Sequence, residues 1–217
     1  MPIHFSTGEM QARKDRAAAA ISDAGLDALL MFKQESMHWL TGYDTFGFSM
    51  FQCLVMTADG RSALLTRAPD YGTAVYTSDI GDVRIWVDVE GMNPAMDLRA
   101  MLDDLGLGGS RVGIELDSYG LRASMWRLVE AELEGFLAWD DTSTLVQELR
   151  RAKSPQALVY VPRAAALGDD AWALSPIHLF RCRPSSFFFS LFSPFSFFTL
   201  FFFFFFFSFS LLSFSFL

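Results

Sequence analysis

The sequence has 217 residues and an uneven distribution of charge. All 25 acidic residues lie at or before Asp170, together with 15 of the 17 basic ones, which gives residues 1–172 a net charge of −10. A domain of this charge repels nucleic acid and anionic membrane surfaces, so we expect neither as a partner. Two cysteines make no disulfide framework, and residues 1–14 contain no signal-peptide pattern, so we expect a cytoplasmic protein.

The amino-terminal part predicts a helix followed by a buried strand. Ser6 and Glu9 have the spacing of a capping box, in which each side chain bonds the backbone N–H of the other residue. Apolar residues then recur at helical spacing, and Gly25 is expected to end the helix. These apolar residues are Met10, Ala17, Ile21 and Ala24. Residues 26–32 are almost all apolar, as in a strand that helices cover on both sides.

Later segments continue the alternation of strands and helices. Residues 51–57 and 62–67 predict two antiparallel strands, because Asp59 and Gly60 between them favour a tight reversal. Periodicity then predicts helices over 69–77, 94–105, 121–134 and 142–151, and strands over 83–88, 112–116 and 136–139. Asp141 is interpreted as the cap of the last helix. The pattern indicates one α/β domain over residues 1–153, with a mixed β-sheet and helices on both faces.

The segment between the first two predicted strands contains the strongest candidate for a functional site. A short helix that includes His38 is expected to end at Gly42, and an aromatic-rich loop follows it. Loops in such positions recognise ligands more often than core strands do. We therefore predict a substrate-binding rim formed by Tyr43, Phe46 and Phe48, with His38 beside it. The alternative is a packed corner in which the aromatic rings only bury one another.

Five short phrases have the order and spacing that are typical of one protein family. They are Gly25-Leu26-Asp27-Ala28-Leu29-Leu30, Leu40-Thr41-Gly42-Tyr43, Arg111-Val112-Gly113-Ile114-Glu115, Asp141-Thr142-Ser143 and Arg150-Arg151-Ala152-Lys153-Ser154-Pro155. With these phrases, residues 5–172 resemble the amino-terminal domain of the creatinase and Xaa-Pro peptidase family. The match is specific for the domain, and it does not specify a substrate.

The resemblance implies a ribonuclease-H-like sheet and a homodimer. In that family a carboxy-terminal catalytic domain acts on peptides or small amides, and the peptidases hold two divalent metal ions there on Asp, His and Glu residues. The amino-terminal domain presents loops at the mouth of the active site, often that of the neighbouring subunit. The resemblance therefore implies a dimerisation and substrate-access domain of a hydrolase.

The chain itself offers no recognisable catalytic or metal site. Its histidines are His4, His38 and His178, and no pair of His or Cys residues has metal-ligand spacing. Adjacent carboxylates such as Asp140 and Asp141 point in different directions on a helix or strand. We therefore predict no catalytic residue, no metal and no cofactor in this chain, which we expect to be inactive on its own. A stand-alone binding module, and a hydrolase that uses unrecognised residues, stay open as alternatives.

The composition changes near residue 172. Residues 154–172 predict the start of a linker helix toward a missing catalytic domain, and Pro162 within it costs about 3 kcal/mol because it removes a backbone hydrogen bond. From Pro184 onward, every residue but one is Phe, Ser, Leu or Pro. These four amino acids share all-pyrimidine codons, so we interpret residues 173–217 as a low-complexity tail from a frameshift or gene-model error. The alternative is a tail-anchored membrane protein, since 34 uncharged residues suffice to span a bilayer.

Overall fold

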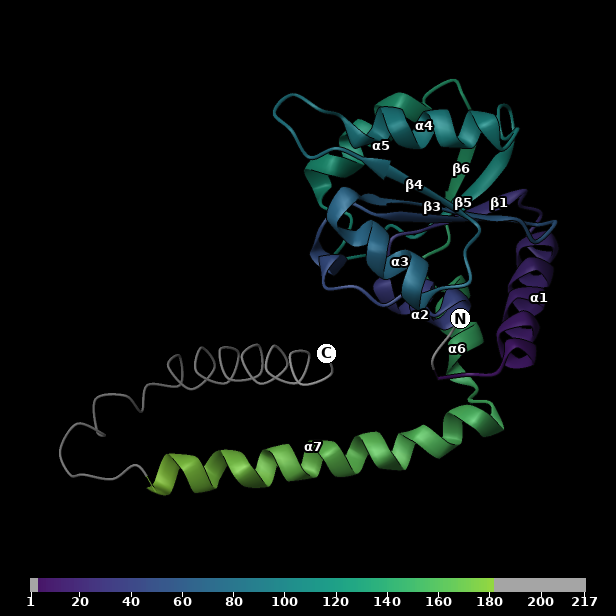
Figure 1. The fold of residues 1–217 in the computed structure, drawn as a ribbon. Helices are drawn as coiled ribbons and strands as arrows, with labels where there is room; N and C mark the ends of the chain where they lie inside the picture. Colours follow the sequence, from purple (N-terminus) through teal and green to yellow (C-terminus); the bar gives the residue numbers. More distant parts are fainter. Residues whose placement is uncertain (1–3, 182–217) are drawn as a thin grey trace. The chain divides into compact units, whose positions relative to one another are not determined.

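The computed structural model describes residues 4–181. A six-stranded sheet in the order β4-β3-β2-β1-β5-β6 forms its centre (Figure 1). The strands are β1 Ala28–Met31, β2 Cys53–Thr57, β3 Ser62–Arg67, β4 Asp82–Trp86, β5 Arg111–Ile114 and β6 Ala138–Asp141. β2 is antiparallel to both of its neighbours, and every other pair is parallel. The predicted α/β fold with a mixed sheet is therefore confirmed.

Helices cover both faces of this sheet. They are α1 Thr7–Asp23, α2 Gln34–Thr41, α3 Tyr71–Thr77, α4 Pro94–Asp104, α5 Ala123–Leu133 and α6 Leu145–Arg151, with short 3₁₀ turns at Gly47–Ser49 and Ala68–Asp70. Figure 1 shows α4 and α5 on one face and α2, α3 and α6 on the other. In β1, Leu30 joins the hydrophobic cluster under α4 and α5, while Leu29 and Met31 join the cluster under α1 and α2. This alternation explains why the strand is apolar at every position.

The amino terminus of α1 has half of the predicted capping box. The Glu9 N–H donates to Ser6 Oγ at 3.3 Å, as expected. The Ser6 N–H donates instead to Oε1 of Gln156 at 3.2 Å, and Gln156 Nε2 donates to Ser6 Oγ at 2.8 Å. The Glu9 carboxylate accepts from Arg13 Nε at 2.9 Å. A residue at the start of α7 (Pro155–Arg181) therefore takes the part that the sequence assigned to Glu9.

The start of α6 corrects another expectation. The helix begins at Leu145 rather than at residue 142, and its N-cap is Thr144. Asp141 ends β6, and its Oδ1 accepts from the backbone N–H and the hydroxyl of Ser143 at 3.0 and 2.5 Å. The side chain of Asp141 therefore stabilises a turn after the strand and does not cap the helix, because a short acidic side chain can bond the backbone two residues on.

A compact unit ends at Leu158, so the first turn of α7 belongs to it. α7 continues to Arg181 without interruption at Pro162, which shows that this proline does not end the helix. No helix among residues 4–181 is long and apolar enough to cross a membrane. The predicted tail over 173–217 lies, from residue 182 onward, outside the described residues.

Candidate functional site

The strand directions bring several loops to one edge of the sheet. β1, β3, β5 and β6 are parallel to one another, and β2 runs the opposite way. The carboxyl ends of the parallel strands and the amino end of β2 therefore meet at the same end of the sheet. α/β sheets usually bind ligands outside the carboxyl ends of their strands. The aromatic loop, residues 42–52, and the Tyr119 loop, residues 115–122, both lie there. They form the candidate site.

Tyr43 anchors the aromatic loop to the core. Gly42 ends α2 with a φ of 78°, as predicted, and the next side chain, Tyr43, is fully buried. Its hydroxyl donates to Gln52 Oε1 at 2.8 Å and lies 3.1 Å from Thr66 Oγ1. Burial raises the pKa of the Tyr43 hydroxyl. For this residue, the structure has the packed corner rather than the exposed rim that the sequence suggested.

A buried polar network then fixes the turn after Tyr43. Asp70 Oδ1 accepts from the Thr45 hydroxyl at 2.6 Å, and the Gly47 N–H donates to Thr45 Oγ1 at 2.9 Å. Arg67 Nε donates to the other oxygen of Asp70 at 3.1 Å. A Cβ at Gly47 would lie only 2.6 Å from both Asp70 Oδ2 and Gln52 Nε2. Only glycine fits here without displacing buried polar groups, so the loop has one well-defined shape.

Two phenylalanines of the loop remain outside the core. The Phe46 side chain is 69% exposed and that of Phe48 is 38% exposed. The Phe48 ring packs edge-on against Tyr119, with ring centres 5.7 Å apart. The Tyr119 hydroxyl donates to Glu35 Oε2 at 2.9 Å. Burial and the bond to Glu35 raise the pKa of Tyr119 to about 12, so this hydroxyl stays protonated and keeps donating at neutral pH.

Glycine also allows the two loops to approach each other. A Cβ at Gly120 would lie 2.7 Å from the Phe32 carbonyl oxygen and 3.2 Å from that of Phe48. The Arg122 guanidinium donates to the Ser49 carbonyl at 3.3 Å. Neither Tyr119 nor Glu35 was predicted as a site residue from the sequence. The sequence signal for Tyr119 is a glycine-containing loop directly after a buried strand, and Glu35 lies in the first turn of α2.

Glu115 holds the start of α2, which leads into the aromatic loop. It is fully buried, and its carboxylate accepts from the N–H groups of Phe32 and Lys33 at 3.2 and 3.1 Å and from the Ser36 hydroxyl at 2.6 Å. The N-cap of α2, Lys33, makes no side-chain cap bond of its own. Glu115 therefore supplies the acceptors that the helix start lacks. Burial raises the pKa of Glu115.

His38 lies on α2 and is half-buried. Burial lowers its pKa, which favours the neutral imidazole at pH 7. Among the described residues, no three His, Cys, Asp or Glu side chains are placed to hold a metal ion. The two buried carboxylates of the site, Glu115 and Asp70, each accept hydrogen bonds from several donors. Because their oxygens are already engaged in these hydrogen bonds, the two carboxylates do not fit a two-metal centre.

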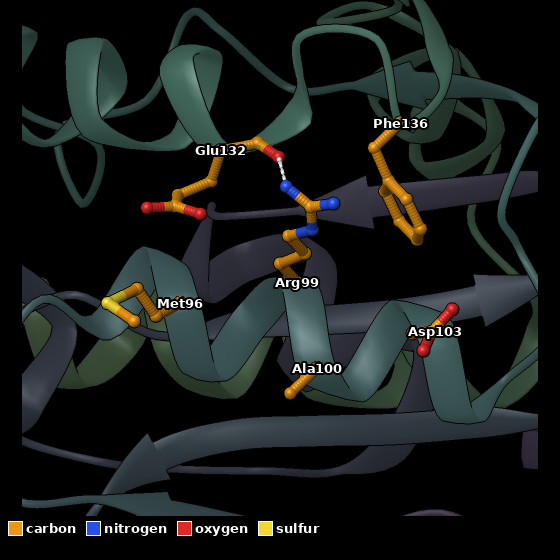
Figure 2. Close-up of a pocket in the computed structure, with 6 residues that line it drawn as sticks. All are labelled: Met96, Arg99, Ala100, Asp103, Glu132 and Phe136. Carbon is orange, nitrogen blue, oxygen red and sulfur yellow. Dashed lines mark hydrogen bonds between the residues drawn. The ribbon is translucent and has the colours of Figure 1, made fainter.

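A pocket of about 350 Å³ lies between α4 and the end of α5. Figure 2 shows the side chains around it. It is lined by Met96, Arg99, Ala100, Asp103, Glu132 and Phe136. The Arg99 guanidinium donates to the Glu132 carbonyl at 3.1 Å and lies 4.9 Å from the centre of the Phe136 ring. Because that carbonyl is in the last turn of α5, Arg99 satisfies a helix terminus. The pocket is separate from the aromatic loop and the Tyr119 loop.

Comparison with known sequences identifies the family. The profile of the Creatinase/Prolidase N-terminal domain matches residues 13–152. The chain belongs to this family. It is 28% identical over 166 residues to the ectoine hydrolase of Halomonas elongata, covering 73% of this chain and 41% of that protein. It is 26% identical over 174 residues to an uncharacterized hydrolase/peptidase, y4tM, of Sinorhizobium fredii, covering 77% and 44%. The chain thus spans less than half the length of these relatives.

Solved structures share the fold of this Creatinase/Prolidase N-terminal domain. A dipeptidase from Pyrococcus horikoshii superposes with a TM-score of 0.61 at 21% identity, over 76% of this chain and 44% of that one. The Creatinase/Prolidase N-terminal domain of an X-Pro dipeptidase from Streptococcus pyogenes gives 0.52 at 17% identity, over 63% and 98%. At these identities, the likeness establishes the fold alone.

Proposed function

We propose that this chain is the substrate-access and dimerisation domain of a creatinase/prolidase-type hydrolase that acts on peptides or small amides. Its relatives include an ectoine hydrolase and a dipeptidase, of which the matched regions cover 41% and 44%. A separate catalytic domain would hold two divalent metal ions and perform the hydrolysis, because the buried carboxylates of the candidate site, Glu115 and Asp70, already have structural hydrogen bonds. We propose a cytoplasmic location.

The exposure of Phe46 on a rigid loop carries this proposal. A buried phenylalanine stabilises a fold by roughly 1.5–3 kcal/mol relative to an exposed one, so a 69% exposed ring forgoes much of that gain. The ring cannot simply turn inward, because Tyr43, Thr45 and Asp70 fix the loop from below. The ring is apolar, and it is held outside the core at the end of the sheet where α/β sheets usually bind ligands. It is therefore suited to contact an apolar part of a substrate.

Phe48 and Tyr119 extend this surface, and contacts between side chains hold both of their rings in place. Their edge-on contact and the Tyr119–Glu35 hydrogen bond fix both rings relative to α2. The candidate rim therefore consists of Phe46 and Phe48 from the aromatic loop and Tyr119 from the neighbouring loop. Tyr43 is buried and anchors the loop beneath this rim, and half-buried His38 lies on α2, which leads into the loop.

The proposal is tested in a full-length hydrolase in which residues 1–172 are followed by a catalytic domain, assayed on Xaa-Pro peptides with Mn²⁺. Phe46→Ala is expected to raise KM while the melting temperature stays unchanged, because the ring is exposed. Tyr43→Ala is the matched control, and it should lower stability by about 3 kcal/mol, because a buried aromatic is lost. Unchanged kinetics in a folded Phe46→Ala enzyme would contradict a role at the rim.

A further inference from the structure

The first turn of α2 holds both loops of the candidate site. Gln34 Nε2 donates to the Tyr43 carbonyl at 2.8 Å, at the start of the aromatic loop. The next residue, Glu35, accepts from the Tyr119 hydroxyl at 2.9 Å, in the Tyr119 loop. Two adjacent residues of one helical turn therefore each bind one of the two loops.

A direct contact between the two loops makes this arrangement a closed one. The Phe48 ring packs edge-on against the Tyr119 ring, with ring centres 5.7 Å apart. From α2, the contacts lead through Tyr43 along the aromatic loop to Phe48, across to Tyr119, and back to α2. We call Gln34, Glu35, Tyr43, Phe48 and Tyr119 the rim network.

The core fixes the base of the rim network. Ser36, the third residue of the same helical turn, donates to the buried Glu115 carboxylate at 2.6 Å. Glu115 also accepts from two backbone N–H groups at the start of α2, and its own N–H donates to the Leu30 carbonyl of β1 at 3.0 Å. The first turn of α2 therefore cannot shift relative to the sheet without leaving a buried carboxylate unsatisfied, which is costly.

Each contact of the rim network restrains both loops, because the network is closed. The aromatic loop is held by Gln34 at its start and by Tyr119 further along, and the Tyr119 loop is held by Glu35 and by Phe48. A segment held at two points opens locally only when both contacts yield. One hydrogen bond changes such an opening equilibrium by roughly threefold to tenfold, so the loss of one contact should loosen both loops measurably.

We propose that the rim network makes the aromatic loop and the Tyr119 loop one rigid unit, with Gln34 and Glu35 as its positioning residues. In the hydrolase proposed above, this unit presents the aromatic rings of the rim in a single arrangement. A substrate then binds without having to order them, which lowers the cost of binding. The effect on substrate binding rests on the proposed function, whereas the coupling of the two loops is a property of this chain alone.

The test is backbone amide exchange in the full chain, measured by NMR at two reporters in each loop. The N–H groups of Gly47 and Met50 report on the aromatic loop, and those of Gly120 and Leu121 report on the Tyr119 loop. Each of these N–H groups donates a hydrogen bond within its own loop, so its exchange measures local opening.

The decisive variants each break one contact and are examined in the opposite loop. Gln34→Ala removes the bond to the aromatic loop and should raise exchange at the reporters of the Tyr119 loop by roughly threefold to tenfold. Tyr119→Phe removes only the hydroxyl that donates to Glu35 and should raise exchange by a similar factor at the reporters of the aromatic loop. The double variant should show less than the product of the two effects, because either change alone opens the network.

Glu35 provides the matched rescue. Glu35→Ala should behave like Tyr119→Phe, whereas Glu35→Gln keeps an acceptor oxygen and should leave exchange close to that of the wild type. Gln11→Ala is the control for Gln34→Ala, because Gln11 donates to Asp15 at 2.8 Å on α1, outside the rim network. It should change exchange in neither loop.

Exchange that rises only in the loop whose contact is removed would overturn the inference, since the two loops would then open independently. Circular dichroism checks the fold of each variant. If Gln34→Ala does not fold, Tyr119→Phe decides the question, because the Tyr119 side chain is 52% exposed and the variant keeps its ring.

Kinetics in the full-length hydrolase test the role in substrate binding. Glu35→Ala should raise KM by roughly threefold to tenfold at unchanged kcat, and Glu35→Gln should restore it. Looser loops with an unchanged KM would overturn this role. A Phe46→Ala enzyme with unchanged kinetics would contradict the proposed function instead, and the exchange measurement, which needs no substrate, would still decide whether the loops are coupled.

Discussion

Glu115 shows how one buried side chain positions the candidate site. Its carboxylate accepts hydrogen bonds from the N–H groups of Phe32 and Lys33 and from the Ser36 hydroxyl. These bonds fix the start of α2, and the end of α2 sets where the aromatic loop begins. Because burial raises the pKa of this carboxyl, its charge is less favourable in the folded chain than in the unfolded one.

The raised pKa predicts a pH dependence of stability. Between the ordinary pKa of a glutamate and the raised value, the folded state binds more protons, so the contribution of Glu115 is fully present at acidic pH and falls as pH rises. Glu115→Gln removes this titration. We expect the free energy of unfolding of the wild type, relative to the variant, to decrease between pH 4 and pH 7 in urea titrations. A tenfold difference in proton affinity between the folded and unfolded chain corresponds to about 1.4 kcal/mol.

The comparison with the variant is needed because other carboxyls act in the opposite direction. The pKa values of Asp59 and Asp141 are lowered, chiefly by hydrogen bonds from Thr57 and Ser143, so their contributions are lost as pH falls. Both groups are present in the wild type and in Glu115→Gln and cancel in the difference. A difference that stays constant or increases with pH would contradict the account of Glu115.

For individual residues, the sequence could identify the aromatic loop but could not show in which direction each ring points. Tyr43 and Phe46 are both large aromatics in the same loop, and their local pattern is alike. What separates them is contact with residues distant in the chain, since Thr66 meets the Tyr43 hydroxyl and Asp70 fixes the turn before Phe46. Tyr119 and Glu35 were missed for the same reason, as 84 residues separate them in the sequence.

The helices and strands of the sheet follow from local pattern, and their ends depend on tertiary contacts. The hairpin of β2 and β3 and the helix start at Pro94 are where the turn and capping residues predicted them. The start of α1 differs, because Gln156 replaces Glu9 in the return bond to Ser6. No local rule connects two residues that are 150 positions apart.

This contact predicts coupling between Ser6 and Gln156. Ser6→Ala should cost about 1 kcal/mol of stability, because it removes the acceptor for the Glu9 N–H at the helix start. Gln156→Ala should cost less, and the double variant should cost less than the sum of the two single changes, because the residues share two hydrogen bonds. A thermal or urea double-mutant cycle on the chain ending at Leu158 measures this, and strict additivity would refute the coupling.

Over the whole molecule, the alternation of strands and helices was sufficient to predict the mixed sheet, because each strand is apolar where helices cover it. The pattern could not show which edge of the sheet is protected or how charge is distributed in space. Those properties arise only when β4 and β6 become the two edges and α3 lies beside β4.

We propose that Phe46 faces the mouth of an active site that a catalytic domain completes. The most direct measurement replaces Phe46 by the photoreactive residue benzoylphenylalanine in the full-length hydrolase, irradiates it with a bound peptide inhibitor, and maps the adducts by mass spectrometry. We expect adducts with the peptide or with loops of the catalytic domain, and none from the same residue at position 128. Equal yields at the two positions, or adducts at position 46 only within residues 1–158, would contradict it.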